Sequence, residues 1–140
     1  MTMRQVSEVV RHRDPLILSE DTTVKHACSC MREARVGAVL VIDKNANLVG
    51  IFTGRDAVTR IAAEGKDAAT TRLGDVMTRD PYTMAPDKTT IDALRLMWER
   101  GFRHVPVVDN GRLLGVVSRG DFRGLEQDRL DEEMLLWERM

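Results

Sequence analysis

Two related stretches decide how this chain folds: Gly115-Val116-Val117-Ser118-Arg119-Gly120-Asp121-Phe122 and, earlier, Gly50-Ile51-Phe52-Thr53-Gly54-Arg55-Asp56. Each runs from an apolar segment, typical of a strand, into a hydroxyl residue that is followed three positions later by a carboxylate. A hydroxyl and the amides that open a helix suit a phosphate, and a carboxylate suits ribose hydroxyls. The same spacing is also the signature of a helix capping box, so one copy alone leaves both interpretations open.

The chain is a tandem duplication. A constant offset of 66 residues separates matching positions up to Asp43, and an offset of 65 separates them from Gly50 onward. The single deletion falls where each repeat is expected to turn between two strands, and such turns tolerate deletions. The matching pairs include Pro15 with Pro81, Ala27 with Ala93, Met31 with Met97, Gly50 with Gly115, and Asp56 with Asp121.

Both repeats predict the same order of elements: a short apolar segment, an Asp-Pro corner, an extended piece, a helix, and two strands joined by a turn. In the second repeat the extended piece is Tyr82–Met84, and the helix ends at Gly101. The strand Val105–Val108 then turns at Asp109-Asn110-Gly111 into the next strand. Pro106 indicates that its strand lies at an edge, or that this backbone position needs no ladder hydrogen bond.

Length and composition predict an ordinary globular protein. The 140 residues suffice for one domain, or for two small halves that share a core, and the net charge of −1 favours neither nucleic acid nor an anionic membrane as partner. No apolar signal core or membrane-length run is visible, which predicts a soluble cytoplasmic protein. Cys28 and Cys30 are two apart in a helical pattern and point to different faces, so we expect buried core thiols and no structural metal.

With Arg103-His104-Val105-Pro106 preceding the second motif, the two full-length copies resemble a tandem pair of cystathionine-β-synthase (CBS) domains, or Bateman module. The resemblance covers about Arg4 to Leu125. It implies an α/β (α+β) fold of two β-α-β-β-α repeats packed about a pseudo-two-fold axis. We place the repeats at residues 4–64 and 72–125, with a linker at 65–71. An apolar stripe at 126–140 predicts a helical extension that contacts a second subunit.

The resemblance also implies a ligand class. Members of this family bind adenosine-containing ligands, namely AMP, ADP, ATP, S-adenosylmethionine or NAD(H), in two clefts between the repeats, and they usually form dimers. Carried over to this sequence, Ser118 would contact phosphate and Asp121 the ribose hydroxyls. Arg103 and Arg119 are candidate phosphate partners because a guanidinium fork suits phosphate oxygens, and His104 is a candidate donor.

The same carry-over assigns residues to both clefts, and it makes the clefts unequal. Where the second repeat has Arg103 and His104, the first has Gly37 and Ala38, which removes both the cation and the imidazole. We therefore expect the cleft that carries Ser118 to be the stronger site. The remaining assignments are Thr83 and Val105 at the purine slot of the second motif, and Thr53, Arg55 and Asp56 with Ile17 in the slot of the first.

Two functions fit these features. The first is an energy- or redox-sensing regulatory module that binds an adenine nucleotide and signals to an unidentified protein. The second is a structural or interaction module with vestigial clefts, which acts through dimerisation. No ordered Ser/His/Asp set, metal cluster or Gly-rich phosphate loop indicates an enzyme, so we expect no catalytic activity and no catalytic cofactor.

Overall fold

The computed structural model describes residues 4–11 and 13–122, and these form two compact units. Unit 1 combines Met1–Arg13 with Tyr82–Met140, and unit 2 is the continuous stretch Asp14–Pro81. The segment that opens each sequence repeat thus packs in the unit formed by the rest of the other repeat. The repeat boundaries along the sequence and the units in space are therefore different divisions of the chain. The predicted extension at 126–140 lies outside the described residues.

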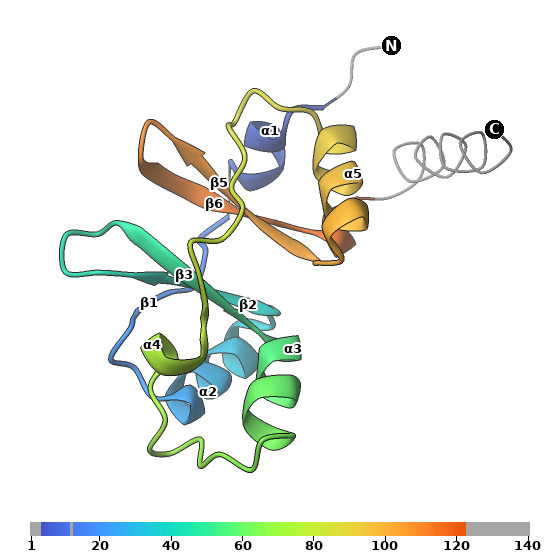
Figure 1. Ribbon diagram of the computed structural model, residues 1–140. Coiled ribbons are helices and arrows are strands. Elements are labelled where there is room, and N and C mark those ends of the chain that lie inside the picture. Colours follow the sequence, from blue (N-terminus) through green and yellow to red (C-terminus); the bar gives the residue numbers. More distant parts are fainter. Residues whose placement is uncertain (1–3, 12, 123–140) are drawn as a thin grey trace, which may run out of the picture. The chain divides into compact units, whose positions relative to one another are not determined.

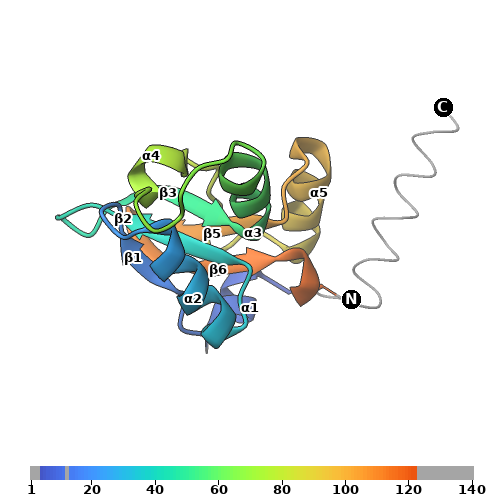
Figure 2. The same ribbon diagram turned by 90° about the horizontal axis from the view of Figure 1, so that it is seen from below.

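Unit 2 is a four-stranded sheet with helices on one face (Figures 1 and 2). The strand order is β1-β2-β3-β4, with β1 parallel to β2 and the other neighbours antiparallel. Both views show α2, α3 and α4 on the same side of this sheet. The elements are β1 (Ile17–Ser19), α2 (Val24–Ala34), β2 (Ala38–Ile42), β3 (Leu48–Thr53), α3 (Gly54–Asp56), the π-helix η1 (Ala57–Ala62), α4 (Leu73–Val76) and β4 (Thr78–Arg79).

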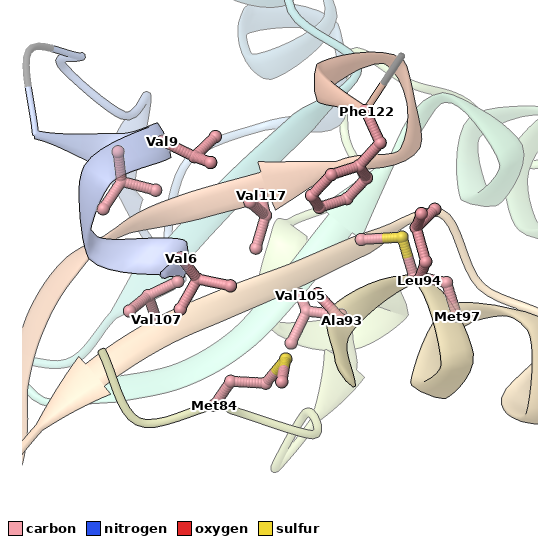
Figure 3. Packing of buried hydrophobic residues seen from close by; sticks show 11 residues of the cluster. Val6, Val9, Met84, Ala93, Leu94, Met97, Val105, Val107, Val117 and Phe122 are labelled. Atoms are coloured by element: carbon pink, nitrogen blue, oxygen red, sulfur yellow. The ribbon is translucent and has the colours of Figure 1, made fainter. Parts of the chain in front are cut away.

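Unit 1 is a two-stranded antiparallel sheet that α1 and α5 cover from one side (Figure 1). The close-up in Figure 3 shows its core, where side chains from both helices meet those of the strands. Val105, Val107 and Val117 are completely buried there. Each such side chain contributes about 1.5 to 3 kcal/mol by leaving water. The elements are α1 (Val6–Val10), α5 (Thr90–Arg100), β5 (His104–Asp109), β6 (Arg112–Ser118) and the 3-10 turn η2 (Arg119–Asp121).

Matching backbone hydrogen bonds attach α1 to unit 1 and α4 to unit 2. In unit 1 the N–H of Val6 at the start of α1 donates to the carbonyl of Lys88 at 2.9 Å. In unit 2 the N–H of Leu73 at the start of α4 donates to the carbonyl of Thr22 at 2.8 Å. Because the N-terminal N–H groups of a helix have no partner inside the helix, these bonds satisfy groups that would otherwise be unpaired. The helix that opens each repeat is thus attached in the same way to the unit formed by the rest of the other repeat.

The two long helices both have capped starts, and the predicted stop at Gly101 is confirmed. The hydroxyl of Thr23 accepts the N–H of His26 at the start of α2, and Thr89 forms a capping box with Asp92 at the start of α5. Helix α5 ends at Gly101, whose φ of 74° is left-handed, as glycine readily allows. At the matching end of α2 the left-handed position is occupied by an arginine, Arg35.

The extended piece predicted at Tyr82–Met84 does not become a strand, and only an isolated parallel bridge to Val107 forms there. Unit 2 shows the reason. Its equivalent strand β1 is held in part by the N–H of Leu40, which donates to the carbonyl of Leu16 at 2.9 Å. The residue 66 positions after Leu40 is Pro106, which has no N–H to donate. The proline thus removes the hydrogen bond that would extend the sheet of unit 1.

Both cysteines are free and half-buried. Cys28 packs against the core of unit 2, and this burial raises the pKa of its thiol. The Sγ of Cys30 lies 3.6 Å from Nε2 of His26, one turn earlier on α2. The expectation of buried core thiols therefore describes Cys28 better than Cys30. Across residues 4–11 and 13–122, every helix is too short or too polar to span a bilayer.

Candidate ligand site at the end of strand β6

The site in unit 1 is built where β6 ends at Ser118. The next three residues form η2, and the backbone N–H of Ser118 donates to Oδ2 of Asp121 at 2.7 Å, in capping-box geometry. The sequence predicts the start of a helix here; in the described part of the chain the turn is a single 3-10 turn. Phe122 then returns to extended backbone, and its buried ring joins the core. The cap therefore fixes the Asp121 carboxylate at the strand end.

The second carboxylate oxygen of Asp121 is held by an arginine that sequence reasoning missed. Nη1 of Arg13 donates to Oδ1 of Asp121, although the two residues are 108 positions apart. The Asp121 side chain is only 10% exposed, whereas that of Arg13 is 50% exposed. No sequence pattern relates these residues, because the contact exists only once the N-terminal segment packs in unit 1.

His104 lies directly across the sheet from Ser118, in register on β5. Burial lowers the pKa of His104 below its ordinary value. The nearby Asp121 carboxylate opposes this shift, and the Arg103 guanidinium adds to it. At neutral pH the imidazole is therefore uncharged, with one ring nitrogen able to donate and the other able to accept a hydrogen bond.

Two arginines flank the turn, and a backbone hydrogen bond keeps them together. The N–H of Arg119 donates to the carbonyl of Arg103 at 2.9 Å. Unit 2 has the same bond between Gly54 and Gly37, at 3.1 Å, where neither partner carries a charge and the nearest cation of the motif is the next residue, Arg55. The predicted difference between the motifs is thus present in the structure: a cation accompanies the backbone bond at Arg103 and is missing at Gly37.

The two residues predicted for the purine slot of this motif have different environments. Thr83 is exposed, next to Met84, whose N–H donates to the carbonyl of Pro106. The side chain of Val105 is 0% exposed and belongs to the core of unit 1. A role for Val105 at a ligand slot stays a prediction, and its side chain already packs in this core.

The first motif repeats the cap geometry in unit 2. Oδ2 of Asp56 accepts both the N–H of Thr53 at 3.0 Å and its hydroxyl at 3.1 Å. Oδ1 of Asp56 faces Nε of Arg60 at 3.4 Å. Arg55 is exposed in the turn, and Ile17 is partly exposed on β1, two strands away from Thr53 in the same sheet. The predicted residues of this motif thus share one sheet, with Ile17 set apart from the turn.

Arg60 is a further residue that the sequence analysis did not single out. Its Nη1 donates to the carbonyls of Val76 at 3.0 Å and Met77 at 3.3 Å, at the end of α4. The signal that was available is its position four residues after Asp56, the spacing of neighbours on a helix. At the corresponding place in the second repeat, 65 residues later, the sequence has Leu125.

A metal site is not apparent in this region. Across the described residues, 4–11 and 13–122, no three His, Cys, Asp or Glu side chains lie close enough together to hold a metal ion. The polar groups at the end of β6 are instead a carboxylate, a neutral imidazole, a hydroxyl and three guanidinium groups, those of Arg13, Arg103 and Arg119. Such a set can recognise hydroxyls and an anion at the same time.

Two α+β units, each with a hydroxyl-x-x-carboxylate turn at a strand end, define a CBS domain pair, a class of regulatory module. The family model of the CBS domain matches residues 6–63 and 73–127. This chain belongs to the CBS-domain family.

Relatives occur in bacteria, archaea and plants. Protein MK0525 of Methanopyrus kandleri is 33% identical over 138 residues, which cover 94% of this chain and 70% of that protein. The CBS domain-containing protein YhcV of Bacillus subtilis is 34% identical over 104 residues, 74% of this chain and 73% of the relative. CBSCBSPB2 of Arabidopsis thaliana is 43% identical over 103 residues, but the match spans only 19% of that longer protein.

Solved structures share the fold. The CBS-domain protein ATU1752 of Agrobacterium tumefaciens aligns with a TM-score of 0.77 at 32% identity, covering 84% of this chain and 89% of its own. The CBS domain protein PAE2072 of Pyrobaculum aerophilum, solved in complex with AMP, aligns with a TM-score of 0.82 at 25% identity, covering 92% and 99%.

Proposed function

We propose that this chain is a regulatory module that binds an adenosine-containing ligand at the Ser118–Asp121 turn and signals to a partner protein. The observation that carries the proposal is the grouping at the end of β6, where the nearly buried carboxylate of Asp121 lies with Arg103, Arg119 and neutral His104. The AMP complex of the Pyrobaculum relative supports the ligand class. AMP, ADP, ATP, NAD(H) and S-adenosylmethionine remain the candidates.

Each group has a role that its chemistry supports. The Asp121 carboxylate accepts hydrogen bonds from the ribose hydroxyls, since an ionised carboxylate is an acceptor only. The guanidinium groups of Arg103 and Arg119 bind phosphate oxygens, and the Ser118 hydroxyl adds a further donor. His104 donates one hydrogen bond from its neutral ring.

The first motif is proposed as a weaker second site. Thr53 and Asp56 reproduce the cap, and Arg55 supplies one cation, with Ile17 as an apolar neighbour on β1. Gly37 in place of an arginine leaves it with less positive charge for a phosphate. We therefore expect single-site occupancy at low nucleotide concentration.

Calorimetric titration of the whole chain with each candidate ligand tests the proposal. The key variant is Asp121→Asn, which keeps the size of the side chain but removes its charge. Asp109→Asn, on an exposed position of the same hairpin, is the matched control. We expect Asp121→Asn to weaken binding at least tenfold and the control to leave it unchanged. If no ligand gives heat or a shift in melting temperature, the proposed function is wrong.

A second proposal, an interaction module that works as a homodimer, is supported by an exposed aromatic surface in unit 1. Trp98 on α5 is 56% exposed, and the exposed ring of Tyr82 stacks on Phe102 at 5.8 Å between centroids, with Arg100 above it at 4.7 Å. Exposed aromatic and arginine side chains are enriched at protein interfaces. If this surface is an interface, Trp98→Ala shifts the sedimentation coefficient towards that of a monomer; an unchanged coefficient contradicts it.

We further propose that the chain acts without catalysing a reaction and that it works in the cytoplasm. Both points rest on the sequence and on the family resemblance. An assay for hydrolysis of the bound nucleotide, run with the same protein as the calorimetry, tests the first. Steady turnover of ATP or NADH above the rate of the Asp121→Asn variant would contradict it.

A further inference from the structure

The two hydroxyl-x-x-carboxylate turns share one pattern of carboxylate contacts. In each, Oδ2 of the aspartate accepts a backbone N–H within the cap, from Thr53 in unit 2 and from Ser118 in unit 1. In each, Oδ1 faces an arginine. The ligand-free chain therefore keeps both carboxylates fully occupied by its own groups.

The two arginines are held very differently. Arg60 lies four residues after Asp56 and is also anchored by two carbonyl oxygens, those of Val76 and Met77. Arg13 reaches Asp121 from the other end of the chain. Among residues 4–11 and 13–122, Asp121 is the sole recorded partner of its half-exposed side chain. One guanidinium is thus built into its unit, and the other is attached by a single contact.

The sequence explains why a distant arginine is used. The residue equivalent to Arg60 in the second repeat is Leu125, which carries no charge. The carboxylate of Asp121 is 90% shielded from solvent, and a shielded carboxylate without a cation is costly. Arg13 supplies that cation through the exchange of the N-terminal segment.

We propose that Arg13 is a displaceable latch on the ligand site: it occupies Oδ1 of Asp121 in the ligand-free chain and leaves when ribose hydroxyls bind that carboxylate. The inference rests on the proposed function and concerns its regulation. A vicinal diol pairs best with both oxygens of a carboxylate; Oδ2 keeps a second acceptor site beside the Ser118 N–H, whereas Oδ1 faces the Arg13 guanidinium. The ligand must therefore compete with Arg13 for Oδ1, and the exchange is feasible because an ion pair with a half-exposed partner is weak.

The position of Arg13 in the chain gives its release a consequence. Arg13 ends the first segment of unit 1, and the next residue, Asp14, opens unit 2. Releasing the guanidinium removes a tie from the segment that leads from one unit into the other. Binding at Asp121 thus changes the contacts of the residue at which the chain passes from unit 1 to unit 2. The free and the bound states then differ in a named contact, which any switch requires.

Calorimetry on the whole chain tests the latch, with Arg13→Gln as the variant and Arg11→Gln as the control. Each variant loses one positive charge, and the two positions lie two residues apart in the sequence. Of the two arginines, Arg13 is the one that contacts Asp121. Adenosine is the principal probe because it carries the ribose without phosphate, and AMP is titrated alongside. We expect Arg13→Gln to bind adenosine about two- to fivefold more tightly than wild type, the gain set by a weak ion pair, and the control to bind as wild type does.

The outcomes separate the latch from the proposed function. If wild type binds and Arg13→Gln binds equally, the latch is wrong and the ligand site stands. Weaker binding by Arg13→Gln also overturns the latch, because Arg13 would then contact the ligand. If neither protein binds adenosine or AMP, the proposed function fails and the latch fails with it.

Limited trypsin digestion gives a second readout with an internal control. Arg13-Asp14-Pro15 and Arg79-Asp80-Pro81 have the same local sequence, so the peptide bond after each arginine has matched neighbours. Arg79 is held within unit 2 by the Gly74 carbonyl at 2.8 Å. Saturating AMP should speed cleavage after Arg13 at least threefold and leave cleavage after Arg79 unchanged. Unchanged or slower cleavage after Arg13 would overturn the latch.

Discussion

A Cβ atom placed on Gly115 of β6 would lie 2.9 Å from Cβ of Val10 in α1, closer than real Cβ atoms approach another heavy atom. Helix α1 thus rests directly on the bare backbone of the strand. In unit 2 the equivalent Gly50 would meet Met77, but there the contacted atoms belong to a flexible thioether side chain. The segment that opens each repeat therefore packs on a strand glycine in both units. The space for a larger residue is most limited in unit 1.

Replacing Gly115 should destabilise the chain by overpacking this contact. We expect Gly115→Val to lower the free energy of unfolding by about 1 to 3 kcal/mol, measured by urea denaturation. Gly50→Ala should cost less than Gly115→Ala, because Met77 can move aside. Gly54→Ala is the control, since no heavy atom lies within 4 Å of its added Cβ. Equal stability of wild type and Gly115→Val would show that α1 does not pack as described.

Arg35→Gly should stabilise the chain. Arg35 has a φ of 56° at the end of α2, a left-handed conformation that costs a residue with a Cβ about 1 kcal/mol. Gly101 fills the matching position at the end of α5 without that cost. We expect the variant to raise the free energy of unfolding by about 0.5 to 1 kcal/mol, and Gly101→Ala to lower it by a similar amount. A melting temperature below that of wild type for Arg35→Gly would contradict this account.

Arg60→Ala should loosen unit 2. The substitution leaves the carbonyls of Val76 and Met77 without a donor and Asp56 without its cation. Because Arg60 is partly exposed and water replaces some of these bonds, we expect a loss of about 1 kcal/mol by urea denaturation. Arg72→Ala is the matched control. Both side chains of the ion pair between Arg72 and Asp21 are exposed, so this pair should contribute little to the free energy of unfolding. Equal losses in the two variants would refute a special role for Arg60.

The titration of His104 should make stability depend on pH. Its pKa is lowered in the folded chain, chiefly by burial, so the unfolded chain binds the proton at a higher pH. This contribution is therefore fully present above the unfolded pKa of about 6.5, and it is lost as the pH falls from there towards the folded pKa. We expect the melting temperature to fall between pH 7.5 and pH 5, and His104→Gln to flatten this slope. An unchanged slope in His104→Gln would contradict this account.

The sequence predicted those parts of the fold that depend on local chemistry. Thr89 starts α5 and Gly101 ends it, and the Asn110-Gly111 turn joins β5 to β6 with both residues at positive φ, because caps and tight turns are decided by neighbouring residues. The α+β class and the membership of the CBS-domain family followed from the repeats and are confirmed.

The parts that the sequence did not predict depend on contacts between distant residues. The duplication offers each opening segment two similar surfaces, and nothing in the spacing says which one it covers. Arg13 was missed for the same reason, since its partner Asp121 lies in the other half of the sequence. The resemblance assigned Val105 to a ligand slot, which stays a prediction, and the alternation of the strand turns its side chain into the core.

The candidate site likewise has a part that the sequence predicted and a part that it did not. The sequence identified Ser118, Asp121, Arg103 and His104 as a group, and the structure brings them to one end of the β5–β6 sheet. Neither arginine that contacts these aspartates belongs to the hydroxyl-x-x-carboxylate motif: the i, i+4 spacing of Asp56 and Arg60 was an available signal, whereas no local pattern relates Arg13 to Asp121. The ligand assignments remain predictions for the titrations to test.

The discontinuous make-up of unit 1 also sets an order of assembly. Unit 2 is one uninterrupted stretch, so it can form once residue 81 has been synthesised. Unit 1 has to wait until β5 and β6 exist, so helix α1 stays without its sheet until residues far along the chain have been synthesised. Contacts that close long loops form slowly. We expect pulsed hydrogen exchange during refolding to protect β2 and β3 before α1. Of the helices described here, α1 is synthesised first and should be among the last to pack.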